Sequence, residues 1–565
     1  MKTVLPLDYI VIVVYLTISL GVGIFFMKFN KGAADFFRGG NKIPWLVSGM
    51  SAFMSGFSAW TFTAASGIAY DHGVVIILMY FGNAISFLFG YWLFAVRWRR
   101  ARISTPMEYL SERFDHPTRQ TFSMSTVFFN LFIVAALLFS LGQFISVATQ
   151  IPVQTIILVA GLITLFYCLL GGLWAVVITD FIQGIILLPF TVVLAIIAIV
   201  KFGGFSGFVN ALPPEMLAIG GSEYSSWTFA FSWFVMVFFG YNTRASAQRY
   251  FSVDTEKSAR KISIFNFVAF IIGAFIWFIP PMAARILYPN IGEVWPNSAT
   301  PQEGAYAVFS LTVLPHGLIG IMLAALFSAC MSSVSSFYNL FASILTTDII
   351  PKYYKKPLSD RQSMTLGRIT TLAIGIVVPM IAIMMSISGE SSFSQMNTFN
   401  AIISLAYGPP ALIGLLTKKT PHWAGLAYFI FAFISGCIGW FFLDWGIPEN
   451  ALYVLPFSVV IMFGANLVTK YIIPEKPVFK ANRDKFFQKL ATPVDAANEV
   501  GDTGNITFTV FQFLARVTTF IALFCLLFLF LKPGDEYVAI LLYSGITLAL
   551  AAVFFKLSKL NYKAT

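Results

Sequence analysis

Apolar stretches about 20 residues long recur along this chain, and each is roughly what an α-helix needs to cross a hydrocarbon core of about 30 Å. Of the 565 residues, 58% are hydrophobic and only 11% are charged. The mean hydropathy of +0.80 is too high for a soluble protein of this size. The sequence therefore predicts an all-α polytopic membrane protein with about 15 transmembrane helices.

The expected spans are numbered 1 to 15 in chain order. They cover residues 5–27, 43–70, 73–98, 118–149, 153–170, 174–200, 226–243, 262–288, 306–346, 366–387, 395–417, 422–444, 450–472, 508–531 and 535–556.

The net charge of +11 follows from how the basic residues are distributed. Nearly all of them lie in the loops after spans 1, 3, 7, 9, 11 and 13 and in the C-terminal tail. The exceptions are Lys2, Lys201, Arg285, Arg516 and Lys532. Under the positive-inside rule the N-terminus lies outside and the C-terminus in the cytoplasm. The charge therefore gives no reason to expect a nucleic-acid partner.

Spans 2 and 7 are each interrupted by glycine among polar residues. The interruptions read GMSAFMSGFSAWTFTAASG at 49–67 and FFGYNTRASAQR at 238–249. Broken helices at matching places in two halves are typical of transporters built from inverted repeats, here spans 2 to 6 and 7 to 11. The alternative is that the glycines only let helices pack closely.

Span 9 carries a cluster of serines, SACMSSVSSFYN at 328–339. At about 100° per residue, Ala329, Ser332, Ser333 and Ser336 fall on one helix face. Hydroxyls and freed carbonyls are hard oxygen donors, which suit a small hard cation such as sodium. The alternative is that the serines bond to carbonyls one turn earlier.

Asp180 lies in span 6, within GGLWAVVITDFIQG at 171–184. A carboxylate inside a span is costly and indicates a functional site, and one without a fixed partner invites a cation. It could instead be a helix-end aspartate that reaches interfacial water, or a group that titrates in a proton-coupled carrier.

Five stretches, in order and on the expected spans, resemble the sodium/solute symporter family, which includes sodium/glucose, sodium/proline and sodium/sialic acid cotransporters. They are FFRGGNKIPW at 36–45, GGLWAVVITDFIQ at 171–183, AQRY at 247–250, PPMAARILYP at 280–289 and ACMSSVSSFYNLFASILTTDI at 329–349. The resemblance covers spans 1 to 13. It implies a five-plus-five inverted-repeat core of the leucine-transporter type, sodium as the coupling ion, and alternating access in the plasma membrane, which in a bacterium is the inner membrane.

The span pattern, the polar segment at 473–507 and the resemblance together predict a domain organisation. It comprises an extra N-terminal helix (1–35), the repeat core (36–420), two additional helices (421–472), a cytoplasmic linker (473–507), and two C-terminal helices with a short tail (508–565).

The resemblance further implies site residues. The principal sodium ion is expected between the carbonyls of Met54, Phe57 and Ala329 and the hydroxyls of Ser332 and Ser333. Asp180 matches an aspartate linked to the sodium route, and Ser336 could join it in a second sodium site. The substrate candidates are Ser58, Trp60, Thr61, Phe239, Tyr241, Asn242, Asn400 and Ser404.

Three departures leave the substrate open. Phe270 stands where the sugar branch has a lysine, Ala401 where it has a glutamine, and Gly56 where the proline branch has an aspartate. We expect import of a small polar solute, a sugar or another neutral or zwitterionic metabolite. A monocarboxylate or an amino acid is the alternative.

Two other classes of function fit less well. A membrane sensor could use the same fold. An enzyme is not expected, because His72, His116, His316 and His422 are scattered over loops and span ends on both sides of the membrane. The expected partners are sodium, the solute and the bilayer, without an organic cofactor.

Overall fold

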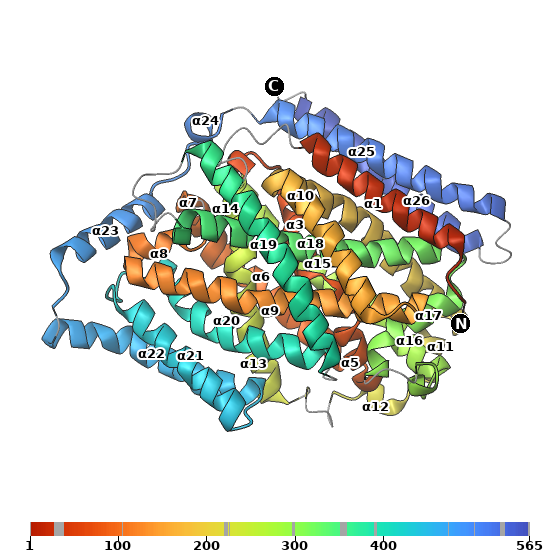
Figure 1. Cartoon of the computed structure of the whole chain (residues 1–565), viewed down its shortest axis with the longest axis horizontal. Helices are drawn as coiled ribbons and strands as arrows, with labels where there is room; N and C mark the ends of the chain where they lie inside the picture. Colours follow the sequence, from red (N-terminus) through yellow and green to blue (C-terminus); the bar gives the residue numbers. More distant parts are fainter. Residues whose placement is uncertain are drawn as a thin grey trace.

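The computed structural model describes residues 2–26, 39–103, 105–219, 224, 226–295, 300–350, 359–388, 392–472, 474–501, 503–531 and 537–562. Throughout these ranges every regular element is a helix (Figure 1).

The first half contains α1 (Pro6–Phe26), α3 (Trp45–Gly56), α4 (Ala59–Phe62), α5 (Ala64–His72), α6 (Val75–Phe89), the π-helix η3 (Gly90–Phe94), α7 (Ala95–Arg100), α8 (Glu108–Arg113), α9 (His116–Thr149), α10 (Val153–Lys201), α11 (Phe205–Ala211), α12 (Pro214–Leu217), α13 (Trp227–Asn242) and α14 (Arg244–Phe251). The second half contains α15 (Glu256–Trp277), α16 (Ile279–Leu287), α17 (Ala305–Val313), α18 (Leu318–Ile344), α19 (Asp360–Ile387), α20 (Ser392–Leu416), α21 (Ala424–Phe442), α22 (Ile447–Tyr471), α23 (Pro477–Ala491), α24 (Ala496–Glu499), α25 (Gly504–Leu526) and α26 (Tyr537–Tyr562).

In the described residues, 11 helices are long and apolar enough to cross a membrane. They coincide with predicted spans 3, 4, 6 and 8 to 15. Spans 1 and 5 fall on the shorter apolar helices Pro6–Ser19 and Val153–Phe166, and spans 2 and 7 on helices broken into pieces. The chain is thus a multi-pass membrane protein, and the count of about 15 spans stays a prediction.

The two predicted interruptions are confirmed. α3 ends at Gly56, Phe57 and Ser58 are extended, and α4 begins at Ala59. α13 ends at Asn242, and α14 follows the extended Thr243. The separation of spans 5 and 6 is wrong. Residues 171 to 173 between them are helical rather than a loop, and α10 runs through both spans. Glycine costs only about 1 kcal/mol in a helix, which tertiary packing overrides.

Helix α18 forms the centre of the fold. Its most apolar window is completely buried, and it packs against α1, α3, α9, α10 and α19 (Figure 1). α25 and α26 lie side by side along one edge, near α1, while α21 and α22 lie along the opposite edge. The serine face of α18 is therefore directed at protein rather than lipid.

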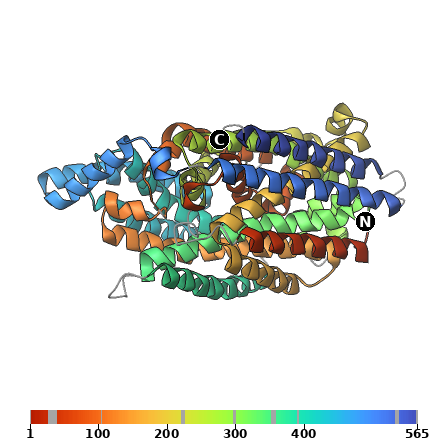
Figure 2. The same ribbon diagram turned by 90° about the horizontal axis from the view of Figure 1, so that it is seen from above.

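The predicted linker contains two helices, α23 and α24. Lys489 of α23 bonds to Glu112 of α8 at 3.1 Å, and Glu499 of α24 pairs with Arg102 at 2.7 Å. Both views place α23 at one end of the molecule (Figures 1 and 2). The linker therefore contacts both α8 and the loop that precedes it.

Candidate functional site

The end of α3 meets the serine face of α18. The Ser333 hydroxyl lies 3.4 Å from the carbonyl oxygen of Met54, 3.4 Å from that of Ser55 and 3.3 Å from that of Ala329. Because α3 ends at Gly56, carbonyls in its last turn lack amide partners within the helix. The structure therefore brings together three of the predicted sodium ligands, Met54, Ala329 and Ser333, from two segments far apart in the sequence.

The other two predicted ligands lie at the same junction. The Ser332 hydroxyl is buried beside the carboxylate of Asp180 and forms no well-aligned hydrogen bond within the described chain. Phe57 caps α3 with an extended backbone, and its ring centroid lies 4.1 Å from that of Trp277. A buried hydroxyl left without a partner costs about 1–3 kcal/mol, and a bound cation would remove that cost.

Asp180 has a fixed partner, contrary to the expectation from the sequence. One carboxylate oxygen accepts a hydrogen bond from Ser51 and lies 3.7 Å from the guanidinium of Arg249. The other oxygen is buried and has no hydrogen-bond partner in the described residues. The pairing arises because α14, which follows the break in α13, packs against α3.

Arg249 is a site residue that sequence reasoning missed. Its Nε donates to Ser51 at 2.9 Å and its Nη2 donates to Ser336 at 2.7 Å. The Ser336 hydroxyl also lies 3.2 Å from that of Ser55. The available signal was its place in AQRY at 247–250, although the expected spans assigned it to the loop after span 7. The structure buries it completely, and a buried charge needs partners. Ser336 thus contacts a cation of the protein, and its role in a second sodium site stays a prediction.

A cavity of about 130 Å³ lies beside this junction. Four of the predicted substrate residues line it: Ser58, Trp60, Tyr241 and Asn400. Gly56 is part of the wall, and a Cβ atom there would lie 2.7 Å from the ring of Tyr241. The break in α3 therefore faces both the serine junction and the cavity.

Thr61 and Asn242, two of the other four substrate candidates, support the cavity rather than line it. Thr61 accepts a hydrogen bond from Tyr80 at 2.9 Å. The Asn242 amide donates to the carbonyls of Ser86 and Phe238 at 3.0 and 2.9 Å. These bonds tie the broken helices to their neighbours.

Of the remaining two candidates, Phe239 packs α13 against α20, whereas Ser404 bonds within α20. The Ser404 hydroxyl lies 3.0 Å from the side-chain oxygen of Asn400. Phe239 is buried against Gly408, where a Cβ atom would clash at 2.3 Å. Both residues therefore contact residues of α20, the helix that carries the cavity residue Asn400.

Two asparagines in the cavity wall were not predicted. Asn397 is only 2% exposed, and neither its amide nitrogen nor its oxygen has a hydrogen-bond partner among the described residues. Asn83 donates to the Tyr241 hydroxyl at 3.4 Å, while its oxygen has no partner in the same part of the chain. The signal was the spacing of Asn397 and Asn400, which places both on one helix face. The cavity thus offers unpaired neutral donors and acceptors.

Comparison with known proteins identifies a family and similar relatives. The family model of the sodium:solute symporter family matches residues 36–427. The chain is 27% identical over 430 residues to the sodium/sialic acid symporter SiaT of Proteus mirabilis (strain HI4320), covering 73% of this chain and 85% of that protein. It is 25% identical over 497 residues to the sodium/glucose cotransporter of Vibrio parahaemolyticus, covering 82% and 90%.

A solved structure of a Na+-coupled sialic acid symporter, in a substrate-bound outward-open state, has a similar fold. The TM-score is 0.73 at 23% sequence identity, and the match covers 83% of this chain and 99% of that chain.

Proposed function

The chain belongs to the sodium:solute symporter family, and from that membership we propose that it is a sodium-coupled symporter that imports a small polar solute by alternating access. The family consists of transporters, and its members named above couple transport to sodium. Sodium and solute move inward together as the two repeats change their relative orientation around the site. The N-terminus lies outside and the C-terminus in the cytoplasm.

One observation carries the sodium assignment. Ser333 of α18 lies within 3.4 Å of the Met54 carbonyl at the broken end of α3. Next to it, the buried Ser332 hydroxyl lies beside the Asp180 carboxylate and forms no well-aligned hydrogen bond within the described chain. Hydroxyl and carbonyl oxygens on two elements match the ligand preference of a hard cation. Sodium binding at this junction would hold the two elements together and raise affinity for the solute, and the solute would raise affinity for sodium equally.

The cavity supports a neutral or zwitterionic solute, such as a sugar. Its described lining contains no lysine, arginine or histidine, whereas Asn397 and Asn83 present unpaired amide atoms. A site built from buried polar groups selects a partner that satisfies them. A monocarboxylate or amino acid would need its carboxylate to be held by neutral donors such as the Ser58 hydroxyl.

Uptake into proteoliposomes tests the proposal. The panel contains labelled sugars, amino acids and carboxylates, with an inward sodium gradient or an equal potassium gradient. We expect one neutral compound to accumulate with sodium only, and Ser332→Ala with Ser333→Ala to abolish the accumulation. Sodium-independent uptake, or unchanged uptake by the double variant, would overturn the proposal.

A further inference from the structure

A large cavity lies where three membrane helices end. Its volume is about 1160 Å³, and η3, α7, α15, α20 and α23 contribute to its walls. The spans Val75–Arg100, Glu256–Leu287 and Phe399–Leu416 all begin or end at this level. Apolar helices give way to charged ends at the membrane interface, so the cavity lies at the depth of lipid headgroups. It is separate from the sodium and substrate site.

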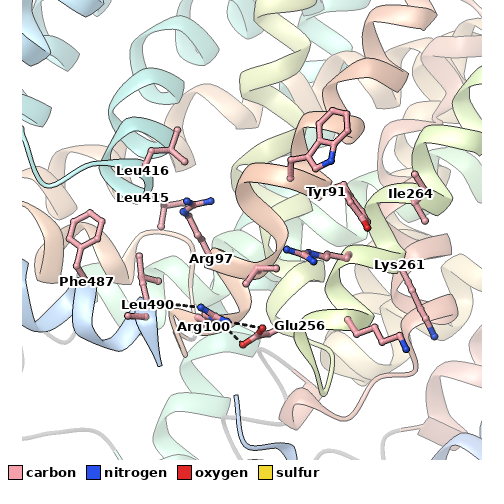
Figure 3. Close-up of a pocket in the computed structure, with 15 residues that line it drawn as sticks. Tyr91, Arg97, Arg100, Glu256, Lys261, Ile264, Leu415, Leu416, Phe487 and Leu490 are labelled. Carbon is pink, nitrogen blue, oxygen red and sulfur yellow. Dashed lines mark hydrogen bonds and ion pairs between the residues drawn. The ribbon is translucent and has the colours of Figure 1, made fainter. Parts of the chain in front are cut away.

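Five cationic side chains line this cavity: Arg97, Arg100, Lys257, Arg260 and Lys261. Arg100 is neutralised by bonds of 2.7 and 3.0 Å to the two carboxylate oxygens of Glu256 (Figure 3). Within the part of the chain that the structure describes, the other four cations form no ion pair with a carboxylate. Glu256 also lies close enough to Arg260 to attract it, so the cavity, with five cations and one carboxylate in its lining, carries a net positive charge.

Neutral groups hold three of these cations in place. Arg97 donates to the carbonyl of Leu93 at 2.5 Å. The guanidinium of Arg260 lies 5.5 Å from the ring centroid of Tyr91, and the Lys261 ammonium lies 5.1 Å from that of Trp45. Such contacts orient the cations without cancelling their charge. A bound anion would relieve their mutual repulsion.

Exposed apolar side chains stand beside the cations. Trp92, Ile264 and Leu416 line the same cavity and are 59%, 39% and 38% exposed. A soluble anion would leave these side chains uncovered, whereas a molecule with acyl chains would cover them. A tryptophan at the end of a span is typical of the interface. The cationic and the apolar side chains of the wall together match an amphiphile with a negatively charged headgroup.

We propose that this cavity binds an anionic phospholipid, whose phosphate lies among Arg97, Lys257 and Arg260 and whose acyl chains lie against Trp92, Ile264 and Leu416. The predicted cytoplasmic location of these basic segments suits the proposal, because that leaflet is rich in anionic lipids. The bound lipid would bridge the ends of α7, α15 and α20 and the linker helix α23.

Native mass spectrometry of the purified full chain tests the site. Phosphatidylglycerol, phosphatidylcholine or inorganic phosphate is added, and retained molecules and the thermal unfolding midpoint are measured. We expect phosphatidylglycerol alone to be retained and to raise the midpoint. Lys257→Gln with Arg260→Gln removes two exposed cations and should weaken retention at least about ten-fold, since each cation near an anionic surface contributes roughly five-fold.

The matched control is Lys556→Gln with Lys559→Gln, which removes two exposed cations from the end of α26. Circular dichroism verifies that both variants fold, and Arg97→Gln provides a second variant within the cavity. Equal losses in the cavity and control variants would overturn the assignment to this cavity. An equal effect of inorganic phosphate would overturn the assignment to a lipid.

Discussion

The guanidinium of Arg249 lies 3.7 Å from the carboxylate of Asp180, and neither side chain is exposed to solvent. Ser51 of α3 bonds to both residues, so one polar network joins α3, α10 and α14. A second sodium ion bound to the other oxygen of Asp180 would lie close to the cation of Arg249 and be repelled by it. The network therefore affects both the number of sodium ions that can bind and the stability of the fold.

Removing one member of this pair should destabilise the fold strongly. We expect Arg249→Met to lower the free energy of unfolding by about 3–5 kcal/mol, because it leaves a buried carboxylate unpaired. Asp180→Asn in the same chain should recover part of that loss. Unfolding of the purified protein in detergent measures both, with Lys559→Met as the surface control. Additive losses in the double variant would show that the two residues are not coupled.

Two serines five residues apart on α18 should separate ion binding from helix packing. Ser333 reaches across to the Met54 carbonyl, whereas Ser328 bonds at 2.8 Å to Ala324 of its own helix. Loss of an oxygen ligand to a charged group costs about 1.5–3 kcal/mol. We therefore expect Ser333→Ala to raise the half-saturating sodium concentration for uptake by roughly ten- to a hundred-fold, and Ser328→Ala to change it little. Equal shifts would assign the serine face to packing.

The broad architecture could be predicted because it depends on local properties of the chain. The length of apolar stretches places the spans, and the glycines around Gly56 and Gly240 mark the two breaks. Spacing alone put Ala329 and Ser333 on one face, and the structure directs that face at the end of α3.

The parts that could not be predicted depend on contacts between distant segments. Asp180 and Arg249 lie on different helices, and only tertiary packing brings them together. Asn397 is a cavity residue because α20 packs beside α9 and α13. The continuous helix at residues 171 to 173 is a further case, since the low helix propensity of glycine argued against a helix there.

Adding a methyl group at Gly56 should impair solute binding. A Cβ atom at this position would lie 2.7 Å from the Tyr241 ring and 3.0 Å from its hydroxyl. Overpacking of this kind costs about 1–3 kcal/mol, so we expect Gly56→Ala to raise the KM for uptake by roughly five- to a hundred-fold. Gly464→Ala is the control, because nothing lies within 4 Å of a Cβ atom there. An unchanged KM in Gly56→Ala would remove Tyr241 from the proposed site.

The linker should loosen on acidification. The hydrogen bond from Arg102 lowers the pKa of Glu499 below its ordinary value of 4.5. This contact therefore stabilises the folded linker above pH 4.5 and is lost as the pH falls through the lower, folded-state pKa. The protection factors of residues 495 to 500 against hydrogen exchange should fall in Glu499→Gln at pH 7, and in the native chain when it is acidified. Identical exchange in the variant and the native chain at pH 7 would contradict this account.

Asp8 should stabilise the central helix from outside it. Its Oδ1 accepts hydrogen bonds from the backbone amides of Gly317 at 2.7 Å and Gly320 at 3.0 Å, where α18 begins. A carboxylate at a helix N-terminus satisfies free amides and favours the helix dipole. We expect Asp8→Ala to cost about 1–3 kcal/mol of unfolding free energy, and Asp8→Asn less, because an amide oxygen still accepts.

The control on the same helix is Thr17→Ala, since the Thr17 hydroxyl is exposed and bonds only locally to Val13 at 2.8 Å. The decisive measurement is hydrogen exchange at the first turn of α18, which should accelerate in Asp8→Ala but not in Thr17→Ala. If exchange there is unchanged while stability falls, Asp8 acts through the packing of α1 rather than by capping α18.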